Sequence, residues 1–220
     1  MSRKAIAMLG ALCLAILAIL ATLATLPSTT AAQSTAPAHK TGPQTIKPGE
    51  RWPDDRGQHI QAHGGGIIKH QGLYYWFGEQ RGEDLPRGQR AVSCYSSPDL
   101  VNWTFRKNVL TMTPADRPAD LPGMGIVLER PKVFYNAKTK QFVMYVHLDD
   151  SGYRAAEVGV ATSETVDGDY TLVKHFRPLG QQSRDIGQFI DDDGTPYLIF
   201  EDRPNGWHIA TLSDDYLSVE

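Results

Sequence analysis

The feature that decides the fold is the stretch RDIGQFIDDDGTPYLIF at residues 184–200. It joins a short apolar run to an aromatic-rich run at Tyr197–Phe200 through the polar turn Asp191–Gly194. Two apolar runs separated by a short turn rich in Asp and Gly are typical of a β-hairpin. An ionisable residue, Asp185, stands directly before this hairpin.

The same unit occurs twice earlier in the chain. The apolar residues that align are Ile67, Val133 and Phe189. The ionisable residues four positions before them are His63, Glu129 and Asp185. In each copy a third short run follows, and we expect a fourth run that closes near Trp103, Tyr170 or Tyr216. Four short strands that recur at about 55–65 residues are typical of β-propeller blades.

A propeller directs the innermost strand of each blade toward one central axis. We therefore expect His63, Glu129 and Asp185 to face one cavity. The sequence after the N-terminal region is long enough for about three blades, whereas a closed ring has at least four. The sequence thus predicts an all-β fold and indicates the N-terminal part of a longer gene product.

The first 32 residues are typical of an export signal. They begin with Arg3 and Lys4, continue through a long apolar stretch, and end in small residues before a cleavage site near Ala32. The stretch is also long enough to span a bilayer as a retained anchor, and this alternative stays open. Residues 33–47 form a flexible spacer by composition, and residues 48–220 hold the blades. These features predict a secreted or periplasmic protein.

The charge, cysteine and histidine content of the chain limits the kinds of partner and ligand that we expect. The net charge is -3 and no basic run follows the N-terminal signal, so we expect no nucleic-acid partner. Cys94 is the one cysteine left once the signal is removed, so no internal disulfide can form. His59 and His63 have the spacing of a zinc pair only on a helix, and Gly64–Gly66 favour a strand. We expect a monomer with no metal or cofactor and, after signal removal, no membrane contact.

The carboxylates at equivalent repeat positions are the main candidates for chemistry. Glu129 and Asp185 each have an arginine as neighbour, so each could form a surface ion pair. Two such residues beside buried strands instead favour a shared concave site, where repulsion and desolvation separate acid and base roles. Glu79 ends an aromatic run and could point into this cleft or solvate a loop. Tyr153 lies in a polar loop, and an aromatic ring beside carboxylates suits a sugar.

The hairpin motif at residues 184–198 resembles glycoside hydrolase family 43, whose catalytic domain is a five-bladed β-propeller. Four further motifs are similar to the exo-β-1,3-galactanase branch of that family. They lie at residues 60–67, 75–79, 91–103 and 129–133. The resemblance extends from about Trp52 to the end of the chain.

This resemblance implies hydrolysis with inversion, in which an acid protonates the leaving oxygen and an activated water attacks the opposite face. It implies that Asp185 tunes the acid and that Glu129, with Asp185, belongs to the catalytic centre. Glu79, Glu129 and Tyr153 match positions that bind the terminal galactose. His63 stands where the wider family has an aspartate base, a departure that the galactanase branch shares.

The acid and the residue that holds the water belong to later blades in this family. The expected function is therefore removal of galactose from the non-reducing end of β-1,3-galactan, with this fragment inactive alone. A family 43 arabinofuranosidase or xylosidase is the alternative within the same fold. A non-catalytic sugar-binding propeller is the alternative from another class, because the usual base is absent.

Overall fold

The computed structural model describes residues 45–220. The predicted export signal and most of the predicted spacer lie outside these residues. In the described part, no helix is long and apolar enough to cross a membrane. Its regular structure is β-strand apart from 3-10 turns at Pro114–Asp116 and Pro178–Gly180, which confirms the all-β prediction.

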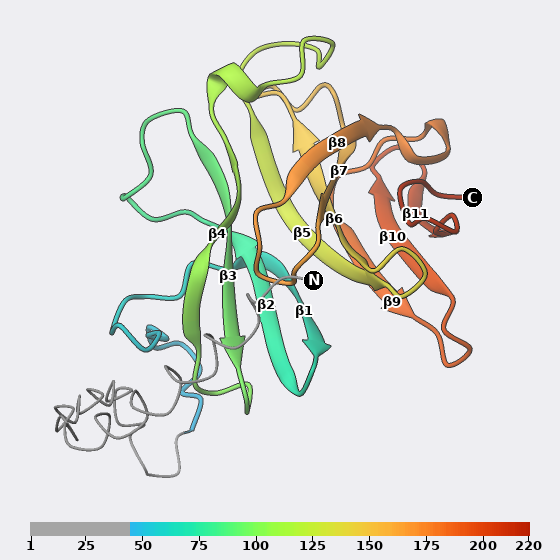
Figure 1. The fold of residues 1–220 in the computed structure, drawn as a ribbon. Coiled ribbons are helices and arrows are strands. Elements are labelled where there is room, and N and C mark those ends of the chain that lie inside the picture. The colour runs from blue at the N-terminus through green and yellow to red at the C-terminus, as the bar shows by residue number, and fades with distance from the viewer. Residues whose placement is uncertain (1–44) are drawn as a thin grey trace, which may run out of the picture. The chain divides into compact units, whose positions relative to one another are not determined.

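In residues 45–220, eleven strands form three antiparallel sheets, each corresponding to one predicted blade (Figure 1). The first blade contains β1 (His63–His70), β2 (Leu73–Glu79), β3 (Arg90–Ser97) and β4 (Thr104–Met112). The second contains β5 (Val127–Asn136), β6 (Gln141–Asp149), β7 (Glu157–Ser163) and β8 (Thr171–Phe176). The third contains β9 (Ile186–Ile190), β10 (Pro196–Asp202) and β11 (Gly206–Thr211). Strands pair in chain order in every sheet, as expected for successive propeller blades.

The prediction for the fourth run was wrong in its position. Trp103 and Tyr170 lie immediately before β4 and β8, so the fourth strands begin there rather than close there. In the third blade a single bridge between Leu212 and Val219 takes the place of a fourth strand. Tyr216 lies in a turn with a φ of 62°, and a left-handed residue interrupts an extended strand.

Blade two lies between two apolar layers. Val133 belongs to a cluster that also contains Phe77 of blade one, whereas the next residue, Phe134, belongs to a cluster with Phe200 of blade three. Successive side chains of a strand point to opposite faces of the sheet, so β5 contributes to both interfaces. These layers hold β1, β5 and β9 next to one another.

The innermost strands of blades one and two are irregular at the same place. The pairing of β1 with β2 shifts between His63 and Gly66, and that of β5 with β6 shifts between Glu129 and Lys132. A Cβ atom on Gly65 would overlap the carbonyl group of Phe77, which confirms close backbone approach at the glycine run. A bulge of this kind redirects the neighbouring side chains.

Polar contacts join the three innermost strands. Gln188 on β9 accepts a bond from the backbone N–H of Val133 at 2.9 Å and donates one to its carbonyl at 3.1 Å. Lys132 donates to the carbonyl of Gly64 on β1 at 3.0 Å. Burial, followed by the nearby charge of Arg130, lowers the pKa of Lys132 to about 8. The backbone around Glu129 is thus tied to both neighbouring blades.

Candidate active site

The two bulged strands place the same pair of residue types opposite each other in reversed order. His63 on β1 pairs with Glu79 on β2, and Glu129 on β5 pairs with His147 on β6. In each pair the histidine Nδ1 lies 3.4 Å from a carboxylate Oε2. The repeat therefore produces two histidine–glutamate pairs, one in each full blade.

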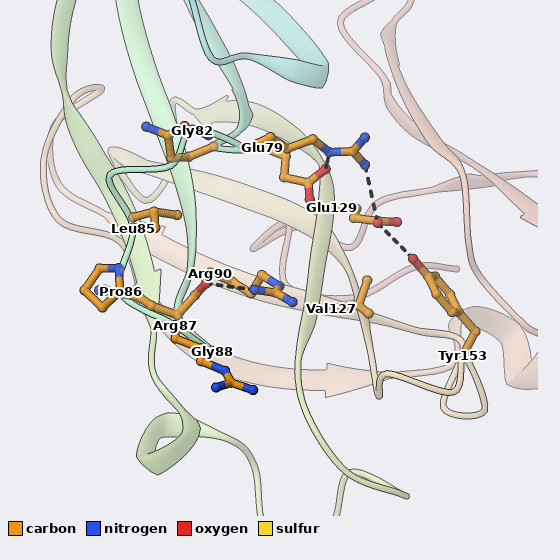
Figure 2. Close-up of a pocket in the computed structure, with 13 residues that line it drawn as sticks. Glu79, Gly82, Leu85, Pro86, Arg87, Gly88, Arg90, Val127, Glu129 and Tyr153 are labelled. Carbon is orange, nitrogen blue, oxygen red and sulfur yellow. Dashed lines mark hydrogen bonds and ion pairs between the residues drawn. The ribbon is translucent and has the colours of Figure 1, made fainter.

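Arg81 connects these two pairs across the blade boundary. Its Nε donates to Glu79 Oε2 at 2.8 Å, and its Nη2 lies 3.7 Å from Glu129 Oε1. The hydroxyl of Tyr153 donates to the same Glu129 oxygen at 3.0 Å. Figure 2 shows Glu79, Glu129 and Tyr153 around one pocket of about 360 Å³. Glu79 is 7% exposed and contributes to this pocket rather than to a solvated loop.

Glu129 is held as a carboxylate by its neighbours. The His147 ring 3.4 Å away and the hydrogen bond from Tyr153 lower the pKa of Glu129, and these effects exceed the opposing effect of burial. Burial and the hydrogen bond to Glu129 raise the pKa of Tyr153, so its hydroxyl stays protonated and donates. A carboxylate beside a tyrosine that is 40% exposed gives a sugar both an acceptor and an apolar surface.

His147 contacts Glu129 but does not line the pocket. The ring is 2% exposed, and its Nε2 lies 2.9 Å from Asp149 Oδ2. Burial lowers the pKa of His147, but the hydrogen bond to Asp149 and the nearby carboxylate of Glu129 outweigh burial and raise it overall. The site therefore favours the protonated form of His147, whose ring lies between two carboxylates. When protonated, His147 follows the rule that a buried charge lies beside a group of opposite charge.

The loop that carries Tyr153 is fastened to the same network. Arg184 donates from Nη1 to Asp149 at 3.2 Å and from Nη2 to the carbonyl of Tyr153 at 2.6 Å. Tyr153 has a φ of 56°, a left-handed conformation that costs energy for a residue with a side chain. The bond from Arg184 holds this conformation and keeps the hydroxyl over Glu129.

Asp185 lies outside the pocket that Glu129 lines. Its Oδ1 lies 2.9 Å from Nε of Arg130, whose side chain covers Gly64. Neither Asp185 nor His63 lines the pocket that Glu79, Glu129 and Tyr153 share. His63 is joined to the pocket through Glu79, whereas Asp185 is joined through Arg130, the residue that follows Glu129. The catalytic and binding roles of these residues stay predictions.

Three contributors to the site were not among the predicted residues: Arg81, His147 and Arg184. A signal for His147 was present in the repeat. His147 stands three residues after Met144, as Glu79 stands three residues after Trp76, and these two apolar residues occupy equivalent register positions. Extending the repeat alignment to the second strand of each blade would have found His147.

Comparison with known proteins gives a consistent result. A family model described as glycosyl hydrolases family 43 matches residues 60–220. An exo-β-1,3-galactanase from Phanerochaete chrysosporium, solved with galactose, is 41% identical with a TM-score of 0.70, and the match covers 80% of this chain and 41% of that one. An exo-β-1,3-galactanase from Clostridium thermocellum is 37% identical with a TM-score of 0.67, over 78% of this chain and 39% of that one.

A third solved structure is a family 43 β-1,3-galactosidase with galactodeoxynojirimycin. It is 35% identical with a TM-score of 0.68, over 78% of this chain and 64% of that one. No curated protein sequence matches this chain. The chain spans about two fifths of the length of the two galactanases, as their coverage of 41% and 39% shows.

Proposed function

Because the chain belongs to glycosyl hydrolase family 43, we propose that it forms part of a glycosidase that removes galactose from the non-reducing end of β-1,3-galactan with inversion. The observation that carries this proposal is the pocket where Glu79 and Glu129, from two different blades, meet Tyr153. The likeness to galactanase and galactosidase structures supports galactose as the sugar.

The geometry suits recognition of one sugar ring. The Glu129 carboxylate can accept hydrogen bonds from sugar hydroxyls, and bonds to a charged group contribute about 1.5–3 kcal/mol each. The exposed part of the Tyr153 ring can pack against the C–H face of the sugar. Arg81 lies between Glu79 and Glu129, and its positive charge offsets the repulsion between the two carboxylates.

Asp185 is assigned the tuning role that the family resemblance implies. Arg130 holds its carboxylate at 2.9 Å and so fixes the direction of the side chain. The resemblance places the acid that Asp185 would tune, and the residue that holds the attacking water, in later blades. The three sheets described here correspond to the first three blades. We therefore propose that residues 1–220 bind galactose but release none from galactan.

Calorimetric titration of the 220-residue protein with galactose, together with an assay of galactose release from β-1,3-galactan, tests this function. We expect binding that the Glu129→Gln variant loses, and no release. Release of arabinose or xylose from matched oligosaccharides by the complete gene product would instead support the alternative family 43 activities. Binding by the complete gene product without any hydrolysis would support the sugar-binding alternative.

Export is also part of the proposal. It is supported by the basic start, the apolar stretch and the small residues before position 33, and a galactan outside the cell would be accessible to a secreted protein. N-terminal sequencing of the protein recovered from the producing cells tests it. A mature N-terminus near residue 33 is expected, and an intact N-terminus in the membrane fraction would indicate a retained anchor.

A further inference from the structure

The connection between β2 and β3, residues 80–89, forms one wall of the pocket (Figure 2). This loop has a defined conformation. The side chain of Gln80 accepts a bond from the N–H of Gly82 at 2.6 Å, and the N–H of Gln89 donates to the carbonyl of Pro86 at 3.0 Å. Gly88 has a φ of 84°, the conformation that a type II turn requires at its third residue. The turn places Arg87 at its second position.

The pocket contains three arginines, and they differ in their partners. Arg81 is paired with both Glu79 and Glu129. Within residues 45–220, neither Arg87 nor Arg90 forms an ion pair. Arg81 thus contacts both carboxylates of the pocket, whereas Arg87 and Arg90 contact neither, and the three arginines outnumber the two carboxylates.

Arg90 is the more informative of these two residues. It is half-buried at the first position of β3, and its Nη1 donates to the carbonyl of Gln89 at 3.0 Å. The acidic residues of the same loop, Glu83 and Asp84, do not line the pocket. A half-buried guanidinium without a carboxylate leaves donor groups available to a ligand. Figure 2 shows the Arg90 side chain extending across the pocket toward Val127.

A guanidinium group matches a carboxylate in shape, because its two parallel N–H groups donate to the two oxygens. The volume of about 360 Å³ lies near the lower end of the range for small-ligand pockets, about 300–1,000 Å³, so one or two sugar units suit it. We propose that Arg87 and Arg90 bind the carboxylate of a hexuronate linked to the galactose that Glu129 and Tyr153 hold. This inference rests on the proposed function and adds a preference for acidic galactosides.

The test is calorimetric titration of the 220-residue protein with pairs of disaccharides that differ in one group. A hexuronosyl-galactose is compared with the neutral hexosyl-galactose of the same linkage, for both 1,3 and 1,6 linkages. We expect the hexuronosyl compound of at least one linkage to bind about tenfold more tightly at low salt, and less so at high salt. Arg87→Gln and Arg90→Gln should each reduce this preference, whereas Arg203→Gln, a control outside the pocket, should retain it.

The outcomes separate the two proposals. Equal binding of acidic and neutral disaccharides, or a preference that survives the Arg87→Gln/Arg90→Gln double variant, would overturn the hexuronate site and leave galactose binding intact. Failure of the neutral disaccharides and galactose to bind, with acidic compounds still bound through the arginines, would overturn the galactose assignment alone. An equal gain for a galactose sulfate ester would overturn the choice of a carboxylate.

Discussion

Replacing His147 by glutamine tests whether the pocket carboxylate depends on a buried imidazolium. His147 is 2% exposed, and its two ring nitrogens lie 3.4 Å from Glu129 and 2.9 Å from Asp149. Removing one partner of a buried ion pair costs about 3–5 kcal/mol. Asp149 keeps its bonds from Arg184 and from two backbone N–H groups. We therefore expect His147→Gln to lower the free energy of unfolding by about 3 kcal/mol, the lower end of that range.

The loss of unfolding free energy in the His147→Gln variant depends on pH, and the pKa shifts of His147 and Glu129 set the direction. Folding raises the pKa of His147, so its contribution is complete below its unfolded value of about 6.5 and is lost as pH rises through the folded value. Folding lowers the pKa of Glu129, so its contribution is present above about 4.3 and is lost as pH falls through the folded value. The difference between wild type and variant is therefore largest between about pH 5 and 6.5.

Urea unfolding followed by tryptophan fluorescence at about pH 5.5 and about pH 9 measures this difference. His59→Gln is the matched control, because His59 is exposed, and it should change the unfolding free energy little at either pH. A His147→Gln cost that is the same at both pH values would refute the buried imidazolium. A cost below about 1 kcal/mol at pH 5.5 would refute the ion-pair geometry as well.

Three further variants address the pocket, the assigned tuning residue and the fold. Tyr153→Phe removes the donor to Glu129, so titration should show galactose affinity reduced about twofold to tenfold, and unchanged affinity would exclude the hydroxyl from binding. In the active complete gene product, Asp185→Asn should lower galactotriose turnover by about a hundredfold or more while galactobiose affinity changes much less; an unaltered rate would remove the tuning role. Gly65→Ala forces a Cβ onto the carbonyl of Phe77, so urea unfolding should show a loss of about 2 kcal/mol or more, and wild-type stability would contradict the close approach.

The sequence alone was enough to predict the strands and their grouping into blades. The hairpin pattern is local, because a turn such as Asp191–Gly194 and its flanking apolar runs lie within a few residues of one another. The same local information placed Tyr153 in a loop and Gly65 at a close backbone approach. It failed at Trp103, because an aromatic residue beside a turn can begin a strand as well as end one.

The tertiary structure decided which charges meet. The arginines beside the predicted carboxylates do not pair with their sequence neighbours: Arg130 binds Asp185, and Arg184 binds Asp149, 35 residues away. Arg81 joins carboxylates from two blades. Such pairings depend on the separation and relative rotation of neighbouring sheets, which are set by the apolar layers around β5. A local sequence pattern does not determine how the sheets pack. Only the tertiary structure therefore shows that Glu129 contacts a buried histidine and that Asp185 lies outside the pocket that Glu129 lines.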